Sequence, residues 1–219
     1  MVSTIEVWWA QIDGDPPSDW QAVLSPDEIA AATAPRQPSE RLRRIATRYF
    51  LRDVLSRSLG VSAGRLCFGR HSGGKPFVLY PGCSGFEFSL SHSSGLAAVA
   101  VAERISVGID IERIDPRLRW HALAHVVIHP ARAAELHGFA EPERMRILLQ
   151  LWTRREAAAK ASGAGLGAAR SGEMSNDAAG MGLFVRDLPA PPDYVAALAA
   201  APEPIQIVNR HWTRGFARR

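Results

Sequence analysis

The segment 105–112, with the sequence ISVGIDIE, constrains the fold of this chain more than any other stretch. Its isoleucines and valine share one parity, whereas Gly108, Asp110 and Glu112 share the other, which is the pattern of a β-strand with one apolar face. Two carboxylates therefore project side by side. Because burial of such a pair is costly without a cation beside it, a divalent ion with oxygen ligands is one natural solution. A solvated polar face would show the same alternation, so this pattern alone leaves both interpretations open.

The composition is that of a protein able to bury its own core, because hydrophobic residues make up 47% of the 219 residues. Cys67 and Cys83 have neither the paired spacing of a metal site nor a disulfide framework, which fits a reducing compartment. Glu6 and the lack of a long apolar run argue against a signal peptide or a spanning helix. We therefore expect a cytoplasmic protein that does not associate with membranes.

Lysine is rare in this chain. Of the 26 lysine and arginine residues, only Lys75 and Lys160 are lysines. A flexible ammonium group can approach a single phosphate oxygen in a way that a planar guanidinium cannot. Both lysines are therefore candidate ligand contacts, although a biased composition would explain either one alone.

The first sixty residues predict a strand followed by two helices. Residues 6–12 have strand character, and a capping-box pattern at Ser25 and Glu28 starts a helix that runs to Pro35. A second helix is expected from about Glu40 to Leu59, with a left-handed Gly60 after it. Four arginines recur on this helix at spacings of three and four residues, and we expect most of them to form a solvated face: Arg41, Arg44, Arg48 and Arg52.

A glycine-rich turn at 72–77 contains Gly74, Lys75 and Pro76. Glycine lets the backbone approach a ligand closely, and Pro76 forces Lys75 toward an extended conformation. Ordinary loops use the same residues, so the turn by itself is weak support for a binding site.

Residues 86–93 and 96–102 are predicted to be consecutive strands that lead into the acidic strand. The first of them alternates apolar residues with hydroxyls. A meander of this kind would bring Ser91 and His92 to the end of the sheet that carries the two carboxylates. A structural, hydrogen-bonded histidine is the alternative for His92.

A long helix is expected from about Pro142 to Ser162, ended by glycines from Gly163 onward. Leu148, Trp152, Glu156 and Lys160 recur at four residues on one face of it, so the charged pair points in the same direction as the apolar residues. A surface ion pair between the two charges is the alternative.

The remaining segments carry weaker signals. We expect a helix and turn at 115–130 with histidines in surface or packing positions, a loop at 171–182, and late strands at 183–185 and 194–199. The tail, 210–219, mixes arginine with aromatic residues and is expected to be a frayed, solvated terminus rather than a nucleic-acid contact. The histidines at 115–130 are His121, His125 and His129.

Taken together, the motifs resemble those of the 4'-phosphopantetheinyl transferase superfamily, of the surfactin-synthetase-activating type. The match runs from the second helix to Lys160, which is about half of the chain, and both lysines fall on motif positions. The segments that carry it are Gly74-Lys75-Pro76, Phe88-Ser89-Leu90-Ser91-His92-Ser93, Val107-Gly108-Ile109-Asp110-Ile111-Glu112 and Trp152-Thr153-Arg154-Arg155-Glu156-Ala157-Ala158-Ala159-Lys160.

The resemblance implies an α+β fold with pseudo-twofold symmetry, in which two similar α/β halves hold the active site between them. Residues 1–103 would form the N-terminal half and contact the nucleotide, and residues 104–219 would carry the metal and catalytic motifs. The protein is expected to act as a monomer.

The implied reaction is transfer of the 4'-phosphopantetheine group from coenzyme A to a serine hydroxyl of an apo acyl or peptidyl carrier protein. It would depend on Mg²⁺ and release adenosine 3',5'-bisphosphate, in the activation of carrier proteins for antibiotics, polyketides or nonribosomal peptides. The implied metal ligands are Asp110, Glu112 and Glu156. The implied catalytic residues are Glu156, as general base, Lys160 and Asp110. The implied coenzyme A contacts are Arg48, Gly74, Lys75, Pro76, Ser91, His92 and Lys160.

The chain departs from the family pattern at three places. Basic residues that the family often has in the first helix are replaced by Glu28 and Ala31, with Arg36 a substitute further on. Arg155 stands where a lysine is common, and Gly163-Ala164-Gly165-Leu166 stands where Gly-Lys-Gly-Leu is frequent. A non-catalytic homologue that only binds carrier proteins is the competing hypothesis. A nucleic-acid-binding function rests only on the net charge of +4 and the tail.

Overall fold

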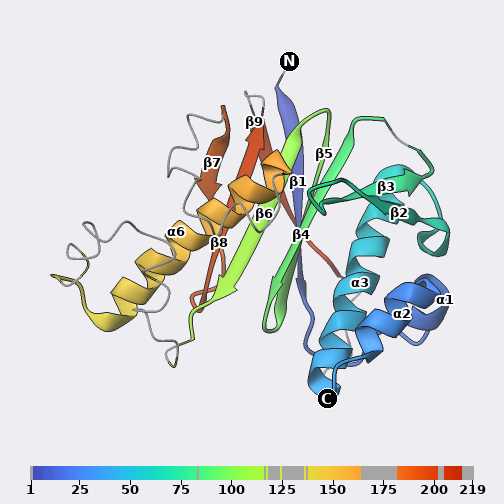
Figure 1. The fold of residues 1–219 in the computed structure, drawn as a ribbon, viewed down its shortest axis with the longest axis horizontal. Coiled ribbons are helices and arrows are strands. Elements are labelled where there is room, and N and C mark those ends of the chain that lie inside the picture. The colour runs from blue at the N-terminus through green and yellow to red at the C-terminus, as the bar shows by residue number, and fades with distance from the viewer. Residues whose placement is uncertain are drawn as a thin grey trace.

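The computed structural model describes residues 2–82, 84–115, 117, 124, 136, 138–163, 182–201 and 205–213. Two β-sheets pack face to face, with α6 on one side and α1–α3 on the other (Figure 1). The elements are β1 (Ser3–Gln11), α1 (Trp20–Val23), α2 (Pro26–Thr33), α3 (Pro38–Leu59), the 3₁₀ turn η1 (Ala63–Arg65), β2 (Cys67–Arg70), β3 (Pro76–Tyr80), β4 (Phe86–Ser93), β5 (Leu96–Glu103), β6 (Ser106–Arg113), α6 (Glu141–Ser162), β7 (Phe184–Asp187), β8 (Tyr194–Ala201) and β9 (Ile205–His211).

The two sheets repeat one topology. The first has the strand order β4-β5-β1-β9 and the second has the order β7-β8-β6. In the first half β1 is followed by α3 and then by the β4–β5 hairpin, and β5 pairs antiparallel with β1. In the second half β6 is followed by α6 and then by the β7–β8 hairpin, and β8 pairs antiparallel with β6. The repetition confirms the predicted α+β fold with two similar halves. The boundary at residue 103 stays a prediction, and β9 returns to pair with β1 of the first sheet.

The segment 105–112 has the predicted apolar face, and in the structure this face lies between the two sheets. Val107, Ile109 and Ile111 are at most 1% exposed and pack with small and branched residues of β1 and β5. On the outer face of the first sheet α3 contributes a second core around Phe50 and Val54. The other face of β6, which carries Asp110 and Glu112, therefore points away from the interface between the sheets.

Local helix signals are confirmed at both ends. The Ser25 hydroxyl accepts the Glu28 amide at 3.3 Å, and the Glu28 carboxylate accepts the Ser25 amide at 3.0 Å, which completes the capping box at α2. Gly60 and Gly163 adopt left-handed conformations, with φ of 66° and 70°, after α3 and α6.

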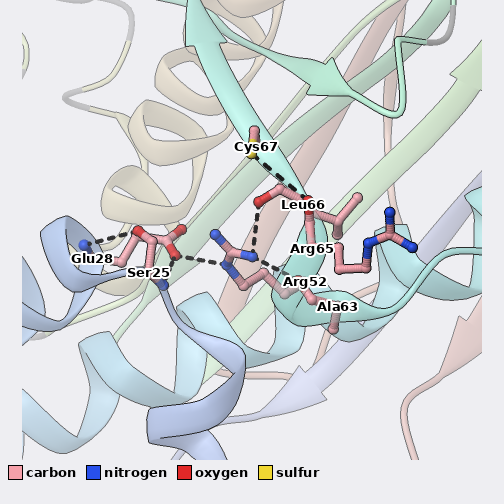
Figure 2. A network of polar contacts seen from close by, with 7 residues as sticks. All are labelled: Ser25, Glu28, Arg52, Ala63, Arg65, Leu66 and Cys67. Atoms are coloured by element: carbon pink, nitrogen blue, oxygen red, sulfur yellow. Dashed lines mark hydrogen bonds and ion pairs between the residues drawn. The ribbon is translucent and has the colours of Figure 1, made fainter.

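Arg52 corrects the prediction of a solvated arginine face on α3. Its side chain is buried, with the residue 1% exposed, and its Nε donates to Glu28 at 2.7 Å (Figure 2). One guanidinium nitrogen also donates to the carbonyls of Ala63, at 2.6 Å, and Leu66, at 3.1 Å. Because Glu28 brings a partly buried counter-charge, Arg52 joins α2, α3 and the chain entering β2, while Arg44 on the same helix stays exposed.

The predicted frayed tail is wrong for residues 210–213. β9 extends to His211, and Trp212 is buried, with its indole N–H donating to Asp53 at 2.7 Å. Its ring packs edge-on against Tyr49 and Phe50 of α3.

Residues 214–219 lie outside the described residues, as do the loop at 171–181 and most of the predicted segment 115–130, including His121, His125 and His129. Within the described ranges no helix is long and apolar enough to cross a membrane.

Candidate functional site

A pocket of about 440 Å³ lies where α3, the β2–β3 hairpin and β4 face α6. It is therefore bounded by both halves of the chain. Among the described residues that line it, four are basic and none is acidic: Arg48, Arg70, Lys75 and Lys160. A cleft lined by charge of one sign concentrates ligands of the opposite sign, so this pocket suits an anionic group.

The predicted Gly74-Lys75-Pro76 motif forms the turn of the β2–β3 hairpin. Gly74 has φ of 83°, a conformation that favours glycine, and Pro76 begins β3. Lys75 enters the pocket wall and forms an ion pair with Glu87 of β4 at 2.7 Å. The motif residues therefore lie at the pocket together.

Arg70 is a pocket residue that the sequence interpretation missed. It stands opposite Pro76 across the hairpin, and its guanidinium donates to the Gly74 carbonyl at 3.1 Å. The signal was an arginine at the end of a short hydrophobic run, but the run Cys67–Arg70 has only four residues and shows little alternation.

His92 lies in an adjoining pocket of about 260 Å³, which shares Arg48 and Leu90 with the basic pocket. Desolvation lowers the pKa of His92, the charge of Glu40 opposes this, and Lys160, Arg48 and Arg44 lower the pKa further. Desolvation likewise lowers the pKa of Arg48, which remains a cation at neutral pH. His92 and Arg48 thus line a pocket that adjoins the basic pocket.

Asp110 is buried beside the basic pocket, with 5% of the residue exposed. Its Oδ1 accepts hydrogen bonds from Ser91 Oγ at 2.9 Å and from Lys160 Nζ at 2.7 Å. Lys160 also donates to the carbonyl of Ile109 at 3.0 Å. The other carboxylate oxygen of Asp110, Oδ2, is buried with no hydrogen-bond partner among the described residues. An anionic atom in this state points to a missing cation or donor.

Glu112 lies two residues further along the same face of β6. Burial raises the pKa of Glu112, the negative charge of Asp110 raises it further, and hydrogen bonding from Ser93 at 3.0 Å acts in the opposite direction. Lys160, which lies beside Asp110 and also lowers the Glu112 pKa, brings one positive charge to these two acids, so the pair keeps an excess of negative charge. This is the environment that a divalent ion would relieve.

Glu156 is buried on α6, with 4% of the residue exposed, one helical turn before Lys160. Within the described part of the chain, however, no three His, Cys, Asp or Glu side chains come together as a metal cluster. The structure therefore does not assemble the predicted set of Asp110, Glu112 and Glu156 as a ready three-ligand site. The pair on β6 still fits Mg²⁺, which commonly takes one or two carboxylates and completes its shell with water and phosphate oxygens.

Gly108 explains how α6 comes close enough to build this site. A Cβ at this position would collide with the carbonyl oxygen of Ala157 and lie 2.5 Å from the amide nitrogen of Ala161. Glycine is therefore required for the helix to lie directly on β6. This close approach places Lys160 against Asp110.

A larger cavity, of about 560 Å³, lies beside Trp9 and Trp212 at the C-terminal end of β1. None of the predicted site residues lines it. The smaller basic pocket, which adjoins the buried acids, is therefore the better candidate for chemistry.

Comparison with known proteins agrees with this geometry. The model of the 4'-phosphopantetheinyl transferase superfamily matches residues 106–188, which include β6 and α6. The chain is 35% identical over 166 residues to 4'-phosphopantetheinyl transferase HetI of Nostoc sp., covering 74% of this chain and 70% of that protein. It is 26% identical to the putative 4'-phosphopantetheinyl transferase slr0495 of Synechocystis sp., covering 76% and 68%. A shorter match, 36% identical over 76 residues, covers 40% of 4'-phosphopantetheinyl transferase AcpT of Salmonella typhimurium. The chain therefore belongs to the 4'-phosphopantetheinyl transferase superfamily of enzymes.

Proposed function

We propose that this enzyme transfers the 4'-phosphopantetheine group of coenzyme A to a serine hydroxyl of an apo acyl or peptidyl carrier protein. The reaction uses Mg²⁺ and releases adenosine 3',5'-bisphosphate. The observation that carries the proposal is the basic pocket between the two halves, which adjoins the Asp110 and Glu112 pair. Two topologically repeated halves in one chain support assignment to the surfactin-synthetase-activating type.

Coenzyme A matches the charge of the pocket, because its pyrophosphate and 3'-phosphate are both anionic. Arg48, Arg70 and Lys75 line the wall formed by the first half, and Lys160 lines the wall formed by α6. Charge-assisted hydrogen bonds from these groups would neutralise the phosphates and orient them. Gly74 and Pro76 shape the turn that carries Lys75, and His92 faces the adjoining groove beside Arg48.

Asp110 and Glu112 are the residues that would hold Mg²⁺, and Oδ2 of Asp110 is the buried oxygen that lacks a partner. When bound, the ion would stabilise the negative charge that develops on the pyrophosphate as its bond breaks. Lys160 lines the pocket and its ammonium donates to Asp110, so it lies where it could contact both the pyrophosphate and the carboxylate.

Glu156 is our candidate for the general base. It lies on α6 four residues before Lys160, so the two share the helix face that meets β6. In the step we propose, the carrier serine oxygen attacks the phosphorus attached to pantetheine, and the serine proton passes to Glu156. The phosphoanhydride P–O bond breaks with its electron pair leaving on adenosine 3',5'-bisphosphate. The transfer is therefore mainly positioning and charge neutralisation.

Intact-mass spectrometry of an apo carrier protein tests this function. The carrier is incubated with the enzyme, coenzyme A and Mg²⁺, with EDTA in a parallel sample. We expect a mass gain of one phosphopantetheine arm, which is lost with the chelator. A carrier that binds the protein but gains no mass, for acyl and peptidyl carriers alike, would favour the non-catalytic homologue instead.

Asp110→Asn and Glu156→Gln are the matched variants, because each keeps the side-chain size while removing a charge. Glu156→Gln is expected to lose turnover by at least about a hundredfold, the order expected when a general base is removed. Asp110→Asn is expected to lose turnover because it removes a ligand of Mg²⁺. Full activity in the first would contradict the metal assignment, and full activity in the second would contradict the assignment of the base.

A further inference from the structure

Three serines on β4 connect the two halves of the molecule. Ser89, Ser91 and Ser93 alternate along the strand, so they share one face. Although β4 and β6 belong to different sheets, each serine oxygen accepts a backbone N–H from β6. The donors are Ile109 to Ser89 at 3.1 Å, Ile111 to Ser91 at 3.2 Å and Arg113 to Ser93 at 3.0 Å. Side-chain hydroxyls thus take the place of a backbone ladder between these strands.

Two of the three serines make a second contact. Ser91 donates its proton to Oδ1 of Asp110 at 2.9 Å, and Ser93 donates to Oε2 of Glu112 at 3.0 Å. A hydroxyl has one proton to donate and can accept at its lone pairs. Because the lone-pair side of each oxygen faces the β6 amide, the proton is directed at the neighbouring carboxylate. Each acid on β6 is therefore oriented by a residue from the other half.

We propose that Ser91 and Ser93 are positioning residues, which hold Asp110 and Glu112 in the orientation that binds the divalent ion. This inference rests on the proposed function. It also gives Ser91 a different role from the predicted nucleotide contact, because its hydroxyl is buried between β6 and Asp110. Hydrogen bonding at Oδ1 leaves Oδ2 of Asp110 as the oxygen open to a cation.

Ser89 provides a matched control. Like Ser91 it is buried and accepts one β6 amide, but the described structure shows it in contact with no carboxylate. Serine-to-alanine substitution at either position removes one link between the strands. Only substitution of Ser91 or Ser93 also removes a hydrogen bond to a carboxylate of β6. A difference in metal binding between the Ser89 variant and the other two therefore reports on the orientation of the carboxylates and not on the link between the strands.

The first experiment titrates the full chain with Mn²⁺ alone, without coenzyme A, and follows the free ion by electron paramagnetic resonance. Removal of a residue that orients a metal ligand typically weakens metal binding by about 10–100-fold. We expect a loss in this range for Ser91→Ala and Ser93→Ala, and a change of less than about threefold for Ser89→Ala, which keeps both second contacts. Ser93→Thr keeps the hydroxyl and is expected to restore binding. Thermal unfolding of the three alanine variants measures the loss of stability separately from the loss of metal binding.

The outcomes separate this inference from the proposed function. If the unsubstituted protein binds no Mn²⁺, the metal assignment fails and this inference fails with it. If it binds Mn²⁺ and the Ser93→Ala variant binds as Ser89→Ala does, the positioning role is overturned while the proposed function stands. Ser93 is only partly buried, so its variant decides the question should Ser91→Ala fail to fold.

A second readout is the transfer assay. For Ser91→Ala we expect the half-saturating Mg²⁺ concentration to rise while the KM for coenzyme A stays near that of the unsubstituted enzyme. A raised KM for coenzyme A with unchanged Mg²⁺ dependence would instead assign Ser91 to the nucleotide.

Discussion

At the scale of single residues, Lys160 joins the basic pocket to the acidic pair. Its ammonium lies 2.7 Å from Oδ1 of Asp110 and 3.0 Å from the carbonyl oxygen of Ile109, and its side chain also lines the pocket. In the protein without substrate it is therefore the counter-charge of a buried carboxylate. The same group is available to a phosphate that enters the pocket.

We expect Lys160→Gln to reduce both stability and turnover. Removing one partner from a buried ion pair typically costs roughly 3–5 kcal/mol, and the partial exposure of Lys160 places the expected loss at the lower end. Urea unfolding measures the loss of stability. As a control, Arg154→Gln breaks an exposed pair with Asp187 and is expected to cost about 1 kcal/mol or less. Equal losses in the two variants would contradict the structural role assigned to Lys160.

His92 makes stability depend on pH. Its pKa is lowered in the folded protein, mainly by desolvation, so on acidification the unfolded chain takes up the proton first. Its contribution to stability is present above the unfolded pKa and is lost as the pH falls through the folded pKa. The unsubstituted protein is therefore expected to lose more stability between about pH 7.5 and pH 5 than His92→Gln does. Urea unfolding at several pH values checks this, and parallel curves for the two proteins would refute it.

At the scale of elements, the contact between β6 and α6 brings together the residues of the candidate site. Asp110 and Glu112 come from the strand, Glu156 and Lys160 come from the helix, and Gly108 permits the close approach of the two. Any side chain at position 108 would have to push the helix outward, because the two nearest atoms that it meets are backbone atoms of α6.

We expect Gly108→Ala to destabilise the protein by about 1–3 kcal/mol, the usual range for overpacking, and to lower turnover because Lys160 moves away from Asp110. Urea unfolding and the mass assay measure the two effects. Gly138→Ala is the control, since a Cβ at that position meets nothing within 4 Å and the glycine does not need a left-handed conformation. A Gly108→Ala protein as stable and active as the control would show that the close packing is not required.

At the scale of the whole molecule, β9 ties the end of the described chain to its beginning. It pairs in parallel with β1, and Trp212 then packs on α3, where its indole donates to Asp53. The last strand thus stabilises the first half although it follows the second in the sequence.

Trp212→Ala is expected to cost about 3–5 kcal/mol, the usual range for removing a buried aromatic ring. Arg210→Ala, on the same strand, removes a partly exposed pair with Glu6 and should cost about 1 kcal/mol or less. Urea unfolding followed by circular dichroism measures both variants. A Trp212 variant as stable as the Arg210 variant would mean that this end of the chain contributes little to the core.

Much of the fold and part of the site could be predicted because the signals are local. The capping box at Ser25, the glycine after each long helix and the alternation at 105–112 depend only on neighbouring residues. Four-residue spacing likewise placed Glu156 and Lys160 on the inner face of α6. These features follow from backbone geometry alone.

Tertiary structure decided which charged groups meet. Sequence spacing predicted a solvated face for most of the four arginines of α3, but Arg52 is buried against a partly buried partner, Glu28 of another helix. The resemblance implies a nucleotide contact for Ser91, which stays a prediction, and the fold adds a hydrogen bond from the Ser91 hydroxyl to Asp110 of β6. Arg70 and Trp212 likewise gain their roles from elements far away in the chain. By itself the sequence determined the helices, the strand with its paired acids and the residue types of the site. Only the tertiary packing, within and between the two halves, determined the partners, because a buried charge is stabilised by whatever lies within a few ångströms of it, however distant in the chain.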